Sequence, residues 1–103
     1  MDVDVRDDTA RHRFEARVDG RLAGFAEYVR TDELVVFTHT EVLDGFGGQG
    51  IGSTLVHRAL DEVRPSGRAV LPVCPFVSGW IARHEDEYGD LRYRSRTRVR
   101  HVD

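Results

Sequence analysis

The chain contains no lysine, a single cysteine and no long hydrophobic run, and each shortage excludes a class of protein. All fifteen basic residues are arginine. Without lysine the chain has neither the Gly-Lys pair of a phosphate-binding P-loop nor a side chain that forms Schiff bases, which excludes P-loop nucleoside triphosphatases and Schiff-base enzymes. Cys74 has no partner for a disulfide within the chain, which favours a reducing compartment.

The shortage of apolar runs predicts a protein that does not enter membranes. No stretch approaches the length of a membrane span, and the acidic start, with Asp2 and Asp4, differs from the basic and then apolar start of a secretory signal. We therefore expect a cytoplasmic location. The length of 103 residues, with 40% hydrophobic and 32% charged residues, predicts one globular domain over residues 1–103.

The first part of the chain alternates apolar and polar residues with a period of two, which predicts strands. Strands are expected over residues 11–18, 21–30 and 34–42. Asp19-Gly20 is typical of a type I′ hairpin turn between the first two. These three strands would form an antiparallel meander. Residues 1–10 are either a frayed lead-in or the start of an edge strand.

After residue 42 the apolar residues are spaced as in a helix. The first helix is predicted to end at Pro65-Ser66-Gly67, and its buried positions are Ile51, Leu55, Val56, Leu60 and Val63. A buried strand follows over residues 68–74. It should lie parallel to the third strand, because a helix separates the two, and Pro72 predicts a bulge or unpaired backbone near its end.

A second helix is expected over residues 75–84, with an apolar stripe of Phe76, Val77, Trp80 and Ile81. The arginine-rich tail over residues 91–103 alternates arginine with other residues, which is typical of a strand with one cationic face or of an extended tail. The predicted fold class is α/β, a βββ-αβα arrangement with a mixed sheet.

A glycine-rich segment, Gly45 to Gly52, joins the third strand to the first helix, and five of its eight residues are glycine. Glycine permits positive φ and a close approach of backbone to a ligand. Unpaired amides and the positive end of the helix dipole favour an anion at such a helix start, most often phosphate. The alternative is a glycine-rich loop without a ligand.

Three segments together resemble the GCN5-related N-acetyltransferase (GNAT) superfamily, in particular its small acetyl-CoA-binding members of the YjdJ type. They are residues 37–42 (FTHTEV), 48–56 (GQGIGSTLV) and 71–77 (LPVCPFV), and the likeness covers about residues 10–88. Family members hold the pyrophosphate of CoA at a glycine loop before a helix. The resemblance therefore implies a minimal single-domain GNAT-like fold with acetyl-CoA or coenzyme A as cofactor.

On this chain the resemblance assigns the pyrophosphate to a loop and the first turn of the helix, at Gly47, Gly48, Gln49, Gly50, Ile51, Gly52 and Ser53. The pantetheine arm would run along the end of the third strand, at Val42 and Leu43, where two parallel strands diverge. The chain departs from the family pattern at Gly47, which replaces an arginine or glutamine, and in the stretched ending before Tyr88.

Acetyl transfer to an amine needs a base, an oxyanion donor and an acid. Glu41 and His39 are two residues apart on one strand, so their side chains share a face and either could accept the amine proton. The alternatives are a solvated acid for Glu41 and a structural histidine for His39. A backbone N–H at Val42 or Leu43 could bind the oxyanion.

Cys74 precedes a helix start, where a thiolate is favoured, and lies where the resemblance places the acetyl group. It could be a nucleophile, an acyl acceptor or the acid for the departing thiolate, and the alternative is a small buried apolar residue. Ser78 is a candidate for contact with pantetheine or a helix-surface residue. Tyr88 is a further candidate acid.

These features predict an N-acetyltransferase that transfers an acetyl group from acetyl-CoA to an amine of a small molecule or protein, as a monomer or homodimer and without a metal. The alternative is a module that binds CoA or another partner without turnover. A nucleic-acid contact through the arginine-rich tail is the weaker alternative, because the net charge of the chain is −3.

Overall fold

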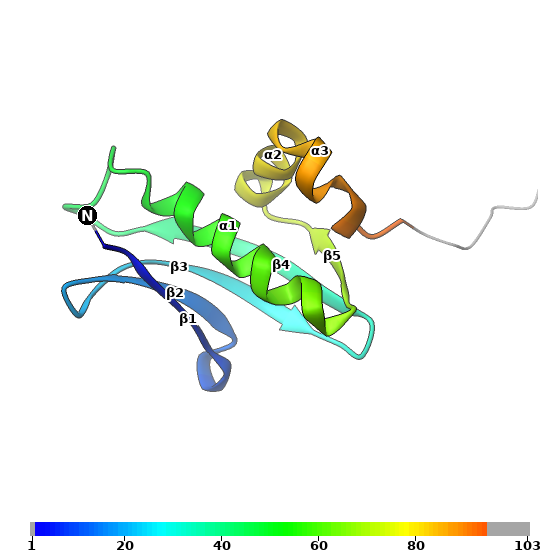
Figure 1. Ribbon diagram of the computed structural model, residues 1–103. Coiled ribbons are helices and arrows are strands. Elements are labelled where there is room, and N and C mark those ends of the chain that lie inside the picture. Colours follow the sequence, from blue (N-terminus) through cyan, green and yellow to red (C-terminus); the bar gives the residue numbers. More distant parts are fainter. Residues whose placement is uncertain (1, 95–103) are drawn as a thin grey trace, which may run out of the picture.

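The computed structural model describes residues 2–94 of the chain, which form a five-stranded sheet with helices on one of its faces (Figure 1). The strand order is β1-β2-β3-β4-β5. The first four strands pair antiparallel, and β4 and β5 pair parallel. The predicted α/β fold with a mixed sheet is therefore confirmed.

The strands are β1 (Asp4–Asp8), β2 (Arg13–Val18), β3 (Arg21–Arg30), β4 (Leu34–Val42) and β5 (Ala69–Pro72). The hairpin turn between β2 and β3 has positive φ at both central residues, 51° at Asp19 and 78° at Gly20, as a type I′ turn requires. Residues 4–8 form an edge strand paired with β2, which decides between the two readings of residues 1–10. The sheet thus has one strand more than the predicted βββ-αβα arrangement.

The helices are α1 (Ile51–Val63), α2 (Pro75–Arg83) and the short α3 (Glu85–Tyr88), and single 3₁₀ turns follow β1, α1 and α3 at Thr9–Arg11, Arg64–Ser66 and Gly89–Leu91. α1 buries all five of its predicted apolar positions. None of the described helices has the length and apolar character needed to cross a membrane.

The core lies between the sheet and the helices. Its largest fully buried side chains from the sheet are Phe14 and Phe37, each 1% exposed, and they belong to one cluster with Leu55 and Leu60 of α1. α2 packs against α1 on the same side of the sheet (Figure 1). No helix of residues 2–94 covers the opposite side, which carries Phe25, Glu27, His39 and Glu41 and is called the open face below.

One residue of the predicted α2 stripe is not buried. Val77, Trp80 and Ile81 lie in the core, but Phe76 is 41% exposed. It lies in the first turn of α2, and its ring approaches Gly52 in the first turn of α1, where a Cβ would stand 2.8 Å from Phe76 Cζ. The helical spacing predicts which residues share a stripe, and it gives no sign that this end of the stripe extends beyond the core.

The arginine-rich tail lies mostly outside the described residues. The described part begins to add to the sheet beside β5, because Tyr93 N–H donates to the Val70 carbonyl oxygen at 2.7 Å. Residues 95–103, which carry three of the five alternating arginines of the predicted cationic face, lie outside the described part of the chain.

Candidate functional site

The glycine loop, Gly45 to Gly52, connects β4 to α1, and three of its glycines have a left-handed backbone conformation. Gly45, Gly48 and Gly50 have φ of 90°, 75° and 74°. Gly50 is the N-cap of α1, and no side chain caps the helix. A residue with a Cβ would be strained at these three positions, so the sequence requires glycine there for the backbone path alone.

The amides of this loop are the feature that the sequence predicted, and they have no protein acceptor. Within the described part of the chain, Phe46 N–H donates to the Leu43 carbonyl oxygen at 3.1 Å, whereas no amide from Gly47 to Ser53 makes a hydrogen bond to protein. Residues 47–50 are exposed. Unpaired amides at the positive end of a helix are suited to an anion.

The side chains of this segment are buried or bonded to other protein groups. Ile51 is buried in the core at 1% exposure, so only its amide faces the loop. The Gln49 amide nitrogen donates back to the Gly45 carbonyl oxygen at 3.5 Å. Ser53 Oγ accepts a hydrogen bond of 2.9 Å from Trp80 Nε1 of α2. The anion site is therefore built mainly from backbone.

The two parallel strands diverge at the end of β5. Their pairing runs from Leu34–Ala69 to Phe37–Pro72. Beyond it Val73 N–H turns back to the Leu71 carbonyl oxygen, and Cys74 N–H reaches the Phe37 carbonyl oxygen at 2.9 Å. Val73 is thus an extra residue on the β5 side, which agrees with the bulge predicted from Pro72. Beyond this point β4 remains paired with β3 but has no partner strand on its β5 side, and we call this stretch, residues 38–42, the splay.

A bulge in β4 decides which groups the splay presents. Phe37 pairs with Tyr28 and His39 pairs with Glu27, so Thr38 is an extra residue. Because side chains and amides alternate along a strand, one extra residue reverses both directions for everything that follows. Phe37 points into the core, and His39 and Glu41 therefore point to the open face, with Thr40 on the helix side.

The two amides proposed to bind the oxyanion, those of Val42 and Leu43, point to opposite sides of the strand. Leu43 N–H donates to the Ala23 carbonyl oxygen at 2.8 Å, so it is not available to a ligand. By the alternation of an antiparallel pair, Val42 N–H then points away from β3 toward the side that β5 has left. The oxyanion role expected for Val42 or Leu43 is therefore wrong for Leu43 and remains a proposal for Val42.

Apolar side chains border the splay. Val42 is 37% exposed, Val73 on the bulge is 59% exposed, and Phe76 at the start of α2 is 41% exposed. These three are among the five large hydrophobic side chains that the described residues leave exposed. An apolar strip thus leads from the glycine loop, where Phe76 meets Gly52, to Cys74.

Cys74 caps α2 and is 5% exposed. Burial raises the pKa of its thiol, but the Thr40 hydroxyl, 3.4 Å from Sγ, and the backbone amides of Val77 and Phe76 act in the opposite direction. The hydrogen bonds together outweigh burial, and the pKa of Cys74 lies below the ordinary cysteine value. The thiol is therefore buried, and its pKa is lowered by the hydrogen bonds around it.

His39 and Glu41 form a pair on the open face. His39 Nε2 lies 3.2 Å from Glu41 Oε1, and the side chains are 54% and 49% exposed. The Phe25 ring lies beside His39, with centroids 6.2 Å apart. The structure therefore brings the two predicted bases together and places Cys74, through Thr40, on the other side of β4.

The remaining two candidates differ in position. Ser78 is half-buried one turn into α2, and its amide donates to the Cys74 carbonyl oxygen at 3.0 Å. The Tyr88 hydroxyl donates to Asp61 at 2.5 Å, well along α1. Burial and this hydrogen bond to Asp61 raise the pKa of Tyr88 to about 12. We therefore leave Tyr88 out of the candidate site.

Sequence reasoning missed two residues that hold the candidate site in place. The sequence gives Thr40 no separate role, although it contacts the thiol, and the apolar stripe of the second helix gives Trp80 no role beyond packing. The signal for Trp80 was available, since a buried indole N–H usually has an acceptor. The signal for Thr40 was hidden by the Thr38 bulge, without which Thr40 would face the other way.

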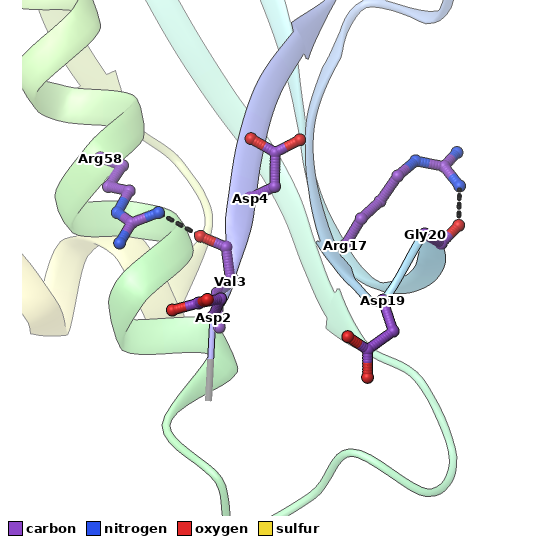
Figure 2. Close-up of a pocket in the computed structure, with 7 residues that line it drawn as sticks. All are labelled: Asp2, Val3, Asp4, Arg17, Asp19, Gly20 and Arg58. Atoms are coloured by element: carbon purple, nitrogen blue, oxygen red, sulfur yellow. Dashed lines mark hydrogen bonds between the residues drawn. The ribbon is translucent and has the colours of Figure 1, made fainter.

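A hollow of about 480 Å³ lies elsewhere, among β1, the β2–β3 turn and α1, and it is lined by Asp2, Val3, Asp4, Arg17, Asp19, Gly20 and Arg58 (Figure 2). Its charged side chains do not converge. Arg58 donates to the Val3 carbonyl oxygen and Arg17 to that of Gly20, while Asp19 points away from both (Figure 2). Both arginines of the hollow are already bonded to backbone carbonyl oxygens, and the hollow does not extend the candidate site.

The chain resembles the NMR solution structure of a GCN5-like protein from Staphylococcus aureus, with a TM-score of 0.63 and 21% sequence identity over 95% of each chain, which is a likeness of fold. A search of curated proteins finds no match. The profile of the GCN5-related N-acetyltransferases matches residues 13–91, most of the chain from β2 to the turn after α3. The chain therefore belongs to the GCN5-related N-acetyltransferase family.

Proposed function

We propose that this protein binds acetyl-CoA and transfers the acetyl group to an amine. The observation that carries the proposal is the row of unpaired amides from Gly47 to Ser53 at the start of α1. These amides would hold the diphosphate of CoA. A loop of this kind without a ligand would leave these amides to water, and its three left-handed glycines would then serve the backbone path alone.

A second helix start supports the same site. Contacts between Gly52 and Phe76, Ser53 and Trp80, and then Asp61 and Tyr88 follow one another along both segments, so α1 runs in the same direction as α2 and α3. The first turns of α1 and α2 therefore lie side by side. The positive end of the α1 dipole favours the negative charge of a diphosphate, and that of α2 favours negative charge on a sulfur near Cys74.

The splay fits the pantetheine arm of CoA. That arm carries amides and methylene groups, so it needs backbone partners together with apolar surface. β4 offers backbone without a partner strand on its β5 side over residues 38–42, and Val42, Val73 and Phe76 supply the apolar border. We propose that the arm takes the place beside β4 that β5 leaves, with its reactive end near Cys74.

Acetyl-CoA supplies an acetyl group activated as a thioester. In the proposed reaction the Val42 amide binds the carbonyl oxygen as negative charge develops on it. The amine arrives over the open face, and the His39–Glu41 pair accepts its proton directly or through a water. A bond forms between the amine nitrogen and the acetyl carbon, the carbon–sulfur bond breaks, and the sulfur takes a proton from the Cys74 thiol.

We assign Cys74 the role of acid rather than nucleophile because of where it lies. Its thiol is buried on the helix side of β4, whereas the proposed bases stand on the open face. An acetyl group attached to Cys74 would lie beneath α2, out of reach of an amine on the open face. A free thiol with this role requires a reducing compartment, so we propose that the protein acts in the cytoplasm.

Two glycines allow a matched test of the anion site. Gly50 and Gly67 have φ of 74° and 75°, and a Cβ at either would meet no atom within 4 Å. Gly50→Asp and Gly67→Asp therefore add the same charge at the same backbone strain, at the start of α1 and after its end. We expect acetyl-CoA to raise the melting temperature of the wild type and of Gly67→Asp, and to leave Gly50→Asp unchanged.

Two outcomes would contradict the proposal. Absence of any shift in the wild type would remove acetyl-CoA binding, and equal shifts in both variants would move the diphosphate elsewhere. Where binding is established, incubation with acetyl-CoA and a panel of amines, followed by mass spectrometry, tests transfer. Binding without acetylation of any amine would favour a CoA-binding module without turnover.

A further inference from the structure

Trp80 makes a hydrogen bond that the proposed reaction does not explain. It is the only tryptophan of the chain and is 2% exposed. Its Nε1–H donates to Ser53 Oγ at 2.9 Å, which connects the second turn of α2 to the first turn of α1. Ser53 is exposed, so the bond joins the core to the edge of the glycine loop.

The indole ring is fixed from several sides. The His84 ring stacks on it with centroids 3.8 Å apart and an interplanar angle of 18°. Tyr88 meets it edge-on at 5.1 Å, and His57 of α1 lies 5.8 Å away. His84 Nδ1 also lies 2.7 Å from the Trp80 carbonyl oxygen. The direction of the indole N–H is therefore set by packing.

The bond leaves the Ser53 proton for another partner. A serine hydroxyl can accept and donate at once, and within the described residues the Ser53 hydroxyl makes only the bond from Trp80. Side chains on a helix lean toward its N-terminus, which here is the row of unpaired amides. A serine inside a helix otherwise tends to donate back to a carbonyl of the preceding turn. Trp80 holds Ser53 in a position where its proton can serve a ligand at the start of α1.

We propose that Trp80 is a positioning residue for the diphosphate of CoA, because it holds the Ser53 hydroxyl with its proton directed to a phosphate oxygen. The inference rests on the proposed function, since it assumes that the diphosphate lies at the glycine loop. It predicts that the contribution of Trp80 to binding depends on the diphosphate and is absent for the pantetheine arm alone.

Two ligands separate these contributions. Acetyl-CoA contains the diphosphate, and S-acetylpantetheine contains the same arm and thioester without it. In Trp80→Phe, which keeps an aromatic ring and loses the N–H, we expect the Kd of acetyl-CoA to rise roughly threefold to tenfold, the effect of one neutral hydrogen bond. The Kd of S-acetylpantetheine should not change, as measured by NMR titration.

Ser53 completes a double-mutant cycle. Ser53→Ala removes the hydrogen bond to a charged group, so we expect the Kd of acetyl-CoA to rise roughly tenfold or more. Because Trp80 acts through Ser53, the double variant should bind acetyl-CoA as Ser53→Ala does. Losses that add up in the double variant, or an equal loss for both ligands in Trp80→Phe, would overturn the proposal and leave Trp80 a packing residue.

A control addresses general loosening of the helices. Asp61→Ala removes the acceptor of Tyr88 and the neighbour of His57, two rings that pack on Trp80, but it keeps the Trp80–Ser53 bond. It should not change the ratio of the two Kd values, and a changed ratio would also overturn the proposal.

If Trp80→Phe does not fold, the wild-type indole N–H resonance, the only one in the spectrum, must shift with acetyl-CoA and stay in place with S-acetylpantetheine; any other pattern counts against the proposal. A wild type that binds neither ligand contradicts the proposed function itself.

Discussion

The two faces of the sheet differ in what they bury and in the chemistry they can support. On the helix side the rings of Phe14, Tyr28 and Phe37 lie 5.3 to 6.4 Å from one another and form the centre of the core. On the open face the Phe25 ring lies under the Arg13 guanidinium at 4.5 Å, among charged neighbours. One side is a solvent-excluded core, and the other is a charged surface.

One strand, β4, places candidate residues on both faces of the sheet. Neighbouring residues of β4 point in opposite directions, so Thr40 holds the thiol on the helix side while His39 and Glu41 stand on the open face. The faces communicate only where β5 leaves β4. A reaction with its acid on one side and its base on the other can therefore take place at the splay and at no fully paired part of the sheet.

The largest expected effect concerns stability and uses one phenylalanine from each face. Phe37→Ala should lower the free energy of unfolding by roughly 3 to 5 kcal/mol, because the ring is fully buried. Phe25→Ala should cost about 1 kcal/mol, a value typical of a partly exposed site. Urea denaturation measures both, and Phe37→Leu with Phe25→Leu serves if Phe37→Ala does not fold. Equal losses would contradict the comparison and would indicate that a second copy or another partner covers the open face in solution.

The next effect concerns turnover and compares Cys74 with Glu41. Cys74→Ala should lower kcat by roughly a hundredfold, typical of a missing acid, with little change in the Kd of acetyl-CoA. The thiol must be protonated to act, and its pKa is lowered, so kcat of the wild type should fall with rising pH before the ordinary cysteine value is reached. That fall should be absent in Cys74→Ala.

Glu41→Gln is the control from the other face. It should also slow turnover but keep the alkaline fall of kcat, because Cys74 is unchanged. A pH profile of kcat for the three proteins tests this division. If the fall persists in Cys74→Ala, or acetyl-CoA alone leaves an acetyl group on Cys74 by mass spectrometry, the assignment of the thiol as acid is wrong.

Much of the fold could be predicted because its signals are local. Asp19-Gly20 favours two positive φ values at adjacent residues, and the period of 3.6 in α1 marks its buried face. β1 could not be decided from sequence, because its alternation is short and largely charged. Its tie to the sheet includes a bond from the Tyr28 hydroxyl to Asp7, 21 residues away in sequence, which no local pattern reveals.

The parts of the candidate site that depend on the positions of glycines could be predicted from the sequence. The parts that depend on strand register could not. Glycines before a helix predict free amides without knowledge of the sheet. The choice of Val42 over Leu43, and of Thr40 as partner of the thiol, depends on one extra residue at Thr38. A bulge has no strong sequence signal, and it reverses every direction after it.

The smallest effect expected concerns alkaline pH and again separates the faces. Burial first, and then hydrogen bonds to Asp7 and Asp61, raise the pKa of Tyr28 and of Tyr88 from 10.0 to about 12. A raised folded pKa means that their contribution to stability is complete below pH 10 and is lost between about 10 and 12. Both rings lie on the helix side of the sheet, so the stability lost at alkaline pH should come from bonds on that side and not from the open face.

Thermal unfolding between pH 8 and 12 measures this loss. Tyr28→Phe and Tyr88→Phe should each be less stable than the wild type at pH 8, by about 1 kcal/mol for one hydrogen bond. Each should also lose less stability by pH 12, so that the curves converge. Cys74 acts with the opposite sign, because a lowered folded pKa adds stability above the unfolded value and loses it as pH falls. Because Cys74 can offset part of the loss in the wild type, the decisive comparison is between each variant and the wild type. Curves of Tyr28→Phe and Tyr88→Phe that stay parallel to the wild-type curve up to pH 12 would mean that the two tyrosines are not held as protonated donors.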